Sequence, residues 1–201
     1  CIRDRNNINK LIHISALGIE EAYESKYASS KLKGEKAVIQ NFENTLILRP
    51  SIVYSSQDNF STMLMGLLNI MPIFPLYYGG RTNFMPIHCS DLCSFITYLI
   101  ENETSEKIIE CVGPEKLSFK EIIEKLLKLT GKKRLLVPMP LSIANFMAFF
   151  FQLLPKPLIT KDQLLLLKYE NIPSGKYKTN NDMEIKLELK FETEVEKYCY
   201  M

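Results

Sequence analysis

The sequence has few of the residues that build metal sites. Two histidines, His13 and His88, stand far apart in a chain of 201 residues, and the five cysteines form no C-x-x-C pair. An odd number of cysteines without ligand spacing is typical of reduced thiols rather than of zinc ligands. We therefore expect free thiols and no metal.

An excess of one charge and long apolar runs are also missing. Lysine and arginine number 25 against 23 aspartates and glutamates, a net charge of +2, so no basic surface for nucleic acid is indicated. The longest strongly apolar stretch, residues 141–154, has 11 apolar residues in 14, whereas a membrane span needs about 20. We expect no nucleic-acid partner and no transmembrane helix.

Length and composition indicate one domain, or one large domain with a small lobe. Hydrophobic residues make up 46% of the chain and charged residues 24%, which is ordinary for a protein with a packed core. The chain starts at Cys1, and the residues that follow are polar rather than a secretory signal. We expect that it begins inside a longer protein.

A strand, a helix and a second strand follow one another near the start. Residues 11–14 form a short apolar run, residues 25–42 are rich in helix formers, and residues 45–48 form a second apolar run that stops at Pro50. Mostly apolar strands on either side of a helix are typical of a parallel βαβ unit. The sequence therefore predicts an α/β fold.

The rest of the chain predicts further elements around a loop-rich segment at 72–86, which holds three prolines and two glycines. Residues 118–121, Ser-Phe-Lys-Glu, form a capping box that begins a helix ending before Gly131. The other expected elements are helices at 61–70, 91–101, from 141 and at 160–169, and strands at 108–112 and 135–137.

Tyr27 and Lys31 lie one helical turn apart, so both side chains leave the same face of the helix. Ser15 follows the first predicted strand, at the strand end where open parallel sheets bind ligands. An ammonium group beside a phenol favours the phenolate and lowers its pKa. Tyr27 could then exchange a proton with a substrate oxygen that Ser15 also holds. The alternative is that Tyr27 packs on the sheet and Lys31 is a solvated surface lysine.

Three segments, His13–Gly18, Tyr27–Lys31 and Leu48–Tyr54, together resemble the middle of an extended or atypical short-chain dehydrogenase/reductase (SDR), in the NAD-dependent epimerase/dehydratase superfamily. Within that superfamily the chain is most similar to the NAD(P)H-binding accessory subunit of respiratory complex I and its bacterial relatives. The similarity covers about residues 11–171 and includes residues 72–76, 79–80, 84–87, 112–114, 134–140, 154–155 and 158–163.

The resemblance implies the C-terminal part of a Rossmann-like parallel sheet, with a small mixed α/β substrate lobe at about residues 72–90 and 113–170. Residues 1–170 would form a partial NAD(P)-binding domain, and residues 171–201 a polar C-terminal tail. The implied catalytic residues are Ser15, Tyr27 and Lys31. The implied contacts to the cofactor, NADP or NAD, are Tyr27, Lys31, Pro50, Ser51, Ile52 and Val53, with Lys31 donating to the nicotinamide ribose.

One part of the family pattern is missing. Its glycine-rich phosphate loop lies in an N-terminal half that this sequence does not contain. Without that turn there is no backbone cradle for the pyrophosphate. We therefore expect weak nucleotide binding by this chain alone.

The expected substrate side includes Ala16, Leu17, Asn83 and His88. Nucleotide-sugar epimerases of the superfamily have an arginine just before the strand at 84–87, where it grips a phosphate. Asn83 stands there in this chain and Arg81 lies two positions off, which disfavours that activity.

The leading interpretation is an NAD(P)(H)-binding, SDR-like protein of the complex I accessory-subunit type, with a mainly structural nucleotide. The alternatives are a reductase acting on a small carbonyl or on a quinone- or isoprenoid-like substrate, a nucleotide-sugar epimerase or dehydratase, and a remnant that only packs against a partner. We expect a location in the cytoplasm or mitochondrial matrix. The Phe-rich helix at 141–154 is either part of the core or a surface that docks on respiratory complex I or on the inner membrane.

Overall fold

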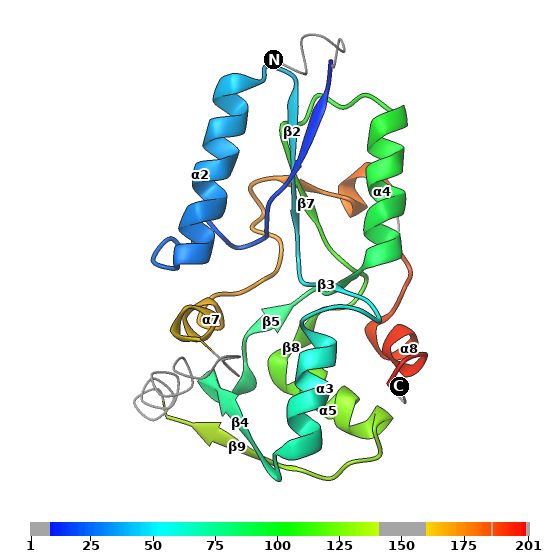
Figure 1. Ribbon diagram of the computed structural model, residues 1–201. Helices are drawn as coiled ribbons and strands as arrows, with labels where there is room; N and C mark the ends of the chain where they lie inside the picture. The colour runs from blue at the N-terminus through cyan, green and yellow to red at the C-terminus, as the bar shows by residue number, and fades with distance from the viewer. Residues whose placement is uncertain (1–8, 141–159, 186, 200–201) are drawn as a thin grey trace.

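The computed structural model describes residues 9–140, 160–185 and 187–199, and its centre is a parallel sheet (Figure 1). The order of the strands is β1-β2-β7-β10, and all three pairings are parallel. Every residue of the inner strand β2 is buried. The predicted α/β fold with a parallel sheet is confirmed. The strands are β1 (Leu11–Ile14), β2 (Thr45–Pro50), β7 (Ile108–Cys111) and β10 (Lys178–Thr179).

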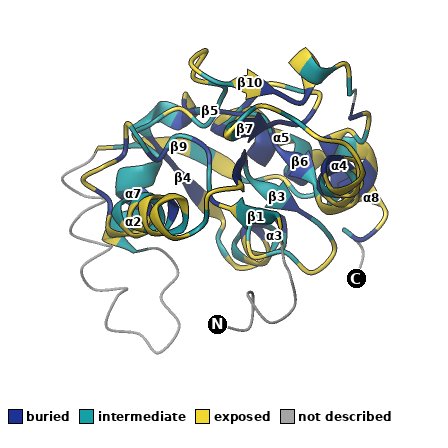
Figure 2. Ribbon diagram, turned by 90° about the horizontal axis from the view of Figure 1, so that it is seen from above, coloured by how far each residue is buried: buried dark blue, intermediate teal, exposed yellow. Residues whose placement is uncertain are grey.

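Two helices flank this sheet. Helix α2 (Lys26–Asn41) and helix α4 (Cys89–Glu101) lie on opposite sides of the strands (Figure 2). The side chain of Ser25 caps the start of α2 by accepting a hydrogen bond from Ala28 N. Only Ala28 and Glu35 of α2 are buried, so the helix touches the sheet along a narrow strip.

A lobe beyond the strand ends holds the largest apolar core, which includes Leu64, Phe74, Phe119 and Ile122. Its helices are α3 (Ser61–Ile70), α5 (Phe119–Leu129) and α7 (Lys161–Leu166). Its strands are β4 (Ile73–Tyr77), paired in parallel with β9 (Leu135–Met139), and β5 (Asn83–Phe84), antiparallel to β8 (Leu117–Ser118). The remaining short elements are β3 (Val53–Tyr54), β6 (Ile87–His88), η1 (Tyr78–Gly80) and η2 (Asn181–Met183).

The segment predicted as a polar tail, residues 171–201, is built into the fold over its described part. It supplies β10 to the central sheet and α8 (Phe191–Glu196) to the lobe. Phe191 and Val195 are 2% and 0% exposed, within the largest core. A helix of six residues, three of them buried, is too short to show helical periodicity, which explains why the sequence pattern missed it.

The predicted Phe-rich helix at 141–154 lies outside the described residues. Over residues 9–140, 160–185 and 187–199, the structure has no helix long and apolar enough to cross a membrane. The same parts of the chain contain no cluster of three or more histidine, cysteine, aspartate or glutamate side chains that could hold a metal ion.

Candidate functional site

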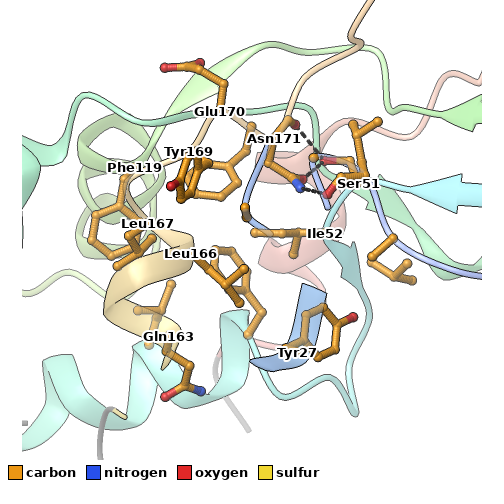
Figure 3. A pocket seen from close by; sticks show the side chains of 18 of the residues that line it. Tyr27, Ser51, Ile52, Phe119, Gln163, Leu166, Leu167, Tyr169, Glu170 and Asn171 are labelled. Carbon is orange, nitrogen blue, oxygen red and sulfur yellow. Dashed lines mark hydrogen bonds between the residues drawn. The ribbon is translucent and has the colours of Figure 1, made fainter. Parts of the chain in front are cut away.

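A cavity of about 450 Å³ lies between the ends of β1 and β2 and the lobe (Figure 3). Its volume is within the usual range of small-molecule sites. The cavity lies at the carboxyl ends of parallel strands, where open α/β sheets bind ligands. Most of the predicted site residues line it, namely Ser15, Ala16, Leu17, Tyr27, Pro50, Ser51, Ile52 and Val53.

Ser15 lines this cavity and has a buried hydroxyl without a partner. Its backbone N–H donates to Leu48 O at 2.7 Å, which continues the pairing of β1 with β2 and fixes the residue at the strand end. The residue is 4% exposed, and its Oγ has no hydrogen-bond partner. A buried hydroxyl without a partner is costly unless a ligand or water binds it. Ser15 is therefore a good candidate ligand contact.

Tyr27 lines the same cavity from the first turn of α2, and its side chain is 44% exposed. Lys31 lies close by, with Nζ 5.9 Å from the centroid of the Tyr27 ring and 3.4 Å from Ile14 O. Contrary to the expected lowering, burial raises the pKa of Tyr27. The phenol is therefore neutral at physiological pH and can donate a hydrogen bond.

Asp162 of α7 holds the end of the helix that carries Tyr27. Its carboxylate accepts hydrogen bonds from Ser25 Oγ at 3.0 Å, Lys26 N at 2.8 Å and Tyr27 N at 3.0 Å. A carboxylate at a helix N-terminus satisfies free N–H groups and complements the helix dipole. Sequence analysis did not find this contact, because Asp162 is far from α2 in the chain.

Asn171 joins two loops that line the cavity, and its side chain lies beside Ser51 (Figure 3). Its Nδ2 donates to Leu17 O at 2.9 Å, and its Oδ1 accepts from Ser51 Oγ at 2.6 Å. Its backbone N–H donates to Asn83 O at 2.8 Å. The side chain therefore fixes the loop after β1 relative to the loop after β2. Sequence analysis missed this role as well.

A buried ion cluster fastens α2 to the sheet beside the cavity. Arg49 of β2, 4% exposed, donates from Nε and one terminal nitrogen to the two carboxylate oxygens of Glu35 at 2.9 and 2.7 Å. Its other terminal nitrogen donates to Glu20 at 2.8 Å. The guanidinium lies 4.8 Å from the centroid of the Tyr177 ring. Burial alone would lower the pKa of Arg49, but the hydrogen bonds and opposite charges of Glu35 and Glu20 raise it overall.

Three predicted site residues, Lys31, Asn83 and His88, are not among the described residues that line the cavity. Asn83 contacts a residue that does line the cavity, since its backbone N–H donates to Glu170 Oε2 at 3.2 Å. His88 is the N-cap of α4, and its Nδ1 accepts from Ser90 N at 3.3 Å. The His88 ring packs edge-on against Tyr54 at 5.1 Å. The geometry gives His88 a structural contact rather than a position in the cavity.

The cavity fits one end of a nicotinamide nucleotide. The free hydroxyl of Ser15 and the apolar wall at Pro50, Ile52 and Val53 suit a flat, polar-edged ring. The other end of the nucleotide finds no counterpart, because the eight glycines of this sequence contain no G-x-x-G-x-x-G. The residues present therefore fit the nicotinamide end alone.

Comparison with curated proteins finds relatives of one main kind. The chain is 29% identical over 144 residues to mitochondrial NADH dehydrogenase (ubiquinone) 1 alpha subcomplex subunit 9 of Dictyostelium discoideum, which covers 71% of the chain and 40% of the relative. It is 23% identical over 181 residues to the mitochondrial NADH-ubiquinone oxidoreductase 40 kDa subunit of Neurospora crassa, covering 89% and 47%. It is 27% identical over 154 residues to a decarboxylating sterol-4-alpha-carboxylate 3-dehydrogenase of Dictyostelium discoideum, covering 75% and 46%. The chain thus spans less than half the length of these relatives.

Several solved structures with the same fold are sugar-nucleotide enzymes. A dTDP-glucose 4,6-dehydratase from Bacillus anthracis, in complex with NAD, matches with a TM-score of 0.62 at 16% identity over 99% of this chain and 63% of the other. A UDP-glucuronic acid 4-epimerase from Bacillus cereus, in complex with UDP-glucuronic acid and NAD, gives 0.60 at 16% over 96% and 62%. No protein-family model matches the chain. The predicted resemblance to complex I subunits and the Rossmann-like fold of the epimerase/dehydratase superfamily are confirmed.

Proposed function

We propose that this chain is the nicotinamide-binding part of an SDR-like accessory subunit of mitochondrial respiratory complex I, in which NADP(H) or NAD(H) is mainly structural. The relatives that are NADH dehydrogenase subunits support the assignment to the complex. The solved structures with bound NAD support the nucleotide. The mitochondrial relatives favour a location in the matrix, peripheral to the inner membrane.

The observation that carries the proposal is the unpartnered, buried hydroxyl of Ser15, a residue that lines the cavity at the strand ends. In the proposed role, Pro50, Ser51, Ile52 and Val53 line the nicotinamide side. Lys31 and Tyr27 hold the adjoining ribose. When bound, the nucleotide would supply hydride-transfer chemistry. The contribution of this chain is to orient one end of the nucleotide and to exclude water from it.

Comparing two nucleotides tests the proposal. The purified, nitrogen-15-labelled chain is titrated with reduced nicotinamide mononucleotide and, separately, with NADH, while backbone amide shifts are followed by NMR. Both should perturb residues 15–17 and 51–53 with dissociation constants within about threefold of each other, because this chain has no cradle for the adenosine diphosphate half.

Matched serine variants serve as the control for this titration. Ser15→Ala should weaken both nucleotides, whereas Ser94→Ala, at an exposed position on α4, should weaken neither. Shifts that map outside the cavity, or NADH binding about a hundredfold tighter than the mononucleotide, would contradict the proposal.

A second candidate function is a reductase acting on a carbonyl substrate. It is favoured by one specific observation, that the Ser15 hydroxyl and the neutral Tyr27 line the same cavity. In that role Ser15 holds the substrate oxygen and Tyr27 gives it a proton. Tyr27→Phe, assayed in the full-length protein with NADPH and a panel of ketones, should then abolish oxidation of NADPH but leave nucleotide binding intact. Turnover by this variant equal to that of the parent would exclude the role of Tyr27.

A further inference from the structure

The cavity extends from the strand ends into the lobe, and this inner part is apolar. Its walls come from α3, β4, α5 and α7, and include Met63, Leu64, Leu67, Phe74, Phe119 and Leu166. In Figure 3, Phe119 and Leu167 lie together on the side away from Ser51, and Ile52 lies between the two ends. The cavity therefore has one polar end and one apolar end.

We propose that the inner part binds a neutral, apolar molecule that carries one hydroxyl or carbonyl oxygen, with this oxygen directed toward Ser15 and Tyr27. The inference rests on the proposed function only for the location of the polar end. The apolar walls alone decide the class of the ligand.

The inner part of the cavity is unsuited to a phosphate group. Among the described residues that line the whole cavity, Glu170 is the single acidic side chain, and there is no lysine or arginine. The Glu170 carboxylate accepts a hydrogen bond from Asn83 N at 3.2 Å. The nearby guanidinium of Arg49 is already bound by Glu35 and Glu20. A diphosphate would therefore enter an apolar site without a cation to pair with it.

The polar end suits a neutral oxygen. Ser15 Oγ is buried and lacks a partner, so it can donate to a hydroxyl or carbonyl oxygen. Tyr27 keeps its proton, because burial raises its pKa, and offers a second donor. The Asn171 amide is engaged through both of its side-chain atoms, because its Oδ1 accepts from Ser51 Oγ and its Nδ2 donates to Leu17 O. Two neutral donors at the end of an apolar cavity are suited to an alcohol or a ketone.

Displacement of a fluorescent probe tests the proposal in the absence of nucleotide. The purified chain is loaded with 1-aminoanthracene, a neutral apolar fluorophore, and competitors are added. We expect displacement at micromolar concentration by farnesol, 1-dodecanol or pregnenolone, and none by UDP-glucose at millimolar concentration. The strongest of the three neutral competitors identifies the body of the ligand as isoprenoid, alkyl or fused-ring. Displacement by UDP-glucose in the same range, or by dodecanoate better than by 1-dodecanol, would overturn the proposal.

Two tryptophan variants on α3 locate the binding. Met63 lines the cavity and is 37% exposed, so Met63→Trp should fill the cavity without loss of a buried contact and weaken the best competitor at least tenfold. Ile70, on the same helix, is 81% exposed and lies outside the cavity, so Ile70→Trp should change nothing. Equal affinities in the two variants would place the ligand elsewhere and refute the proposal.

Ser15→Ala provides a measurement that does not depend on filling the cavity. It should remove the preference for farnesol over the hydrocarbon farnesene, a change of about two- to tenfold, and leave the affinity for farnesene intact. An unchanged preference would refute the position of the oxygen. Because nucleotide is absent, loss of apolar binding with intact binding of the mononucleotide would refute this inference alone, and the opposite result would refute the proposed function alone.

Discussion

Gly113 follows β7 and allows two backbone segments to touch. A Cβ at this position would lie 1.8 Å from Pro86 O, and the Gly113 N–H donates to Met85 O at 3.1 Å. Gly113→Ala should therefore lower the free energy of unfolding by about 2 kcal/mol or more, because backbone must move to make room. Urea denaturation followed by circular dichroism would measure the loss.

Gly66 provides the matched control for this substitution. It lies within α3, is exposed, and would bring no atom within 4 Å of an added Cβ. Gly66→Ala should raise stability by up to about 1 kcal/mol, since alanine has the higher helix propensity. Equal effects at the two glycines would show that the contact with Pro86 does not matter.

At the residue scale, sequence analysis found the residues whose spacing along the chain is informative. Ser15 and Tyr27 stand at a strand end and on the helix that follows, so a local pattern places both near one edge of the sheet. Asn171 lines the same cavity, and Asp162 bonds to the start of the helix that carries Tyr27; each contact joins residues more than a hundred positions apart in the chain. A single asparagine or aspartate in a polar segment gives no sign of such a partner, so these two were missed.

At the scale of elements, α7 controls the start of α2 through Asp162. Burial alone would raise the pKa of this carboxyl, but hydrogen bonds from Tyr27 N, Lys26 N and Ser25 lower it overall. Asp162→Ala should lower the free energy of unfolding by about 1–2 kcal/mol, a typical value for the loss of an N-cap. Asp162→Asn, which keeps one acceptor oxygen, should give a smaller loss. Thermal unfolding of both variants would measure the difference. A larger loss for asparagine than for alanine would contradict this role.

Glu192 links α8 to α5 and should make their packing sensitive to acid. Hydrogen bonds from Lys125 and Lys128, both at 2.7 Å, lower the pKa of Glu192 from 4.5 to about 2. A carboxyl whose pKa is lower in the folded protein than in the unfolded chain stabilises the fold at every pH above its pKa in the unfolded chain. This contribution disappears as the pH falls toward its pKa in the folded protein.

The corresponding test compares the chain with Glu192→Gln between pH 7 and pH 2. Because the pair is partly exposed, the difference in unfolding free energy should be about 1 kcal/mol at most at pH 7. The difference should be constant down to about pH 4.5 and vanish near pH 2, as measured by urea denaturation at each pH. A difference that grows as the pH falls would contradict the assignment.

Elements with local signals were predicted well, and elements that depend on distant pairing were not. Helix α5 has a capping box in which Ser118 and Glu121 bond to each other's backbone, as predicted. Strand β4, by contrast, lies in the segment predicted to be loop. It pairs with β9, some 60 residues further along the chain, with Ile73 opposite Leu135, and such a distant partner leaves no local pattern in the sequence. The stability of β4 comes from this pairing and from the lobe core rather than from its own sequence.

For the whole molecule, α8 is the part that completes the lobe core. Phe191 is 2% exposed and packs 5.0 Å from Tyr54, whose hydroxyl donates to Leu189 O. Phe191→Ala should lower the free energy of unfolding by about 3–5 kcal/mol, through lost burial and the cavity left behind. Glu196→Ala, at an exposed position on the same helix, should have little effect in the same denaturation experiment. Similar stabilities for the two variants would mean that α8 is not part of the core.

The ion cluster around Arg49 has a consequence for how this sequence can change over evolutionary time. Glu35 and Arg49 are 4% exposed each, and the guanidinium satisfies both carboxylate oxygens. Loss of Arg49 alone leaves the buried carboxylate of Glu35 without a partner, and loss of Glu35 alone leaves Arg49 with Glu20 only. Joint replacement of a buried ion pair by apolar residues of similar volume is often neutral. Positions 35 and 49 are therefore expected to change together in homologues, either as an ion pair or as two apolar residues.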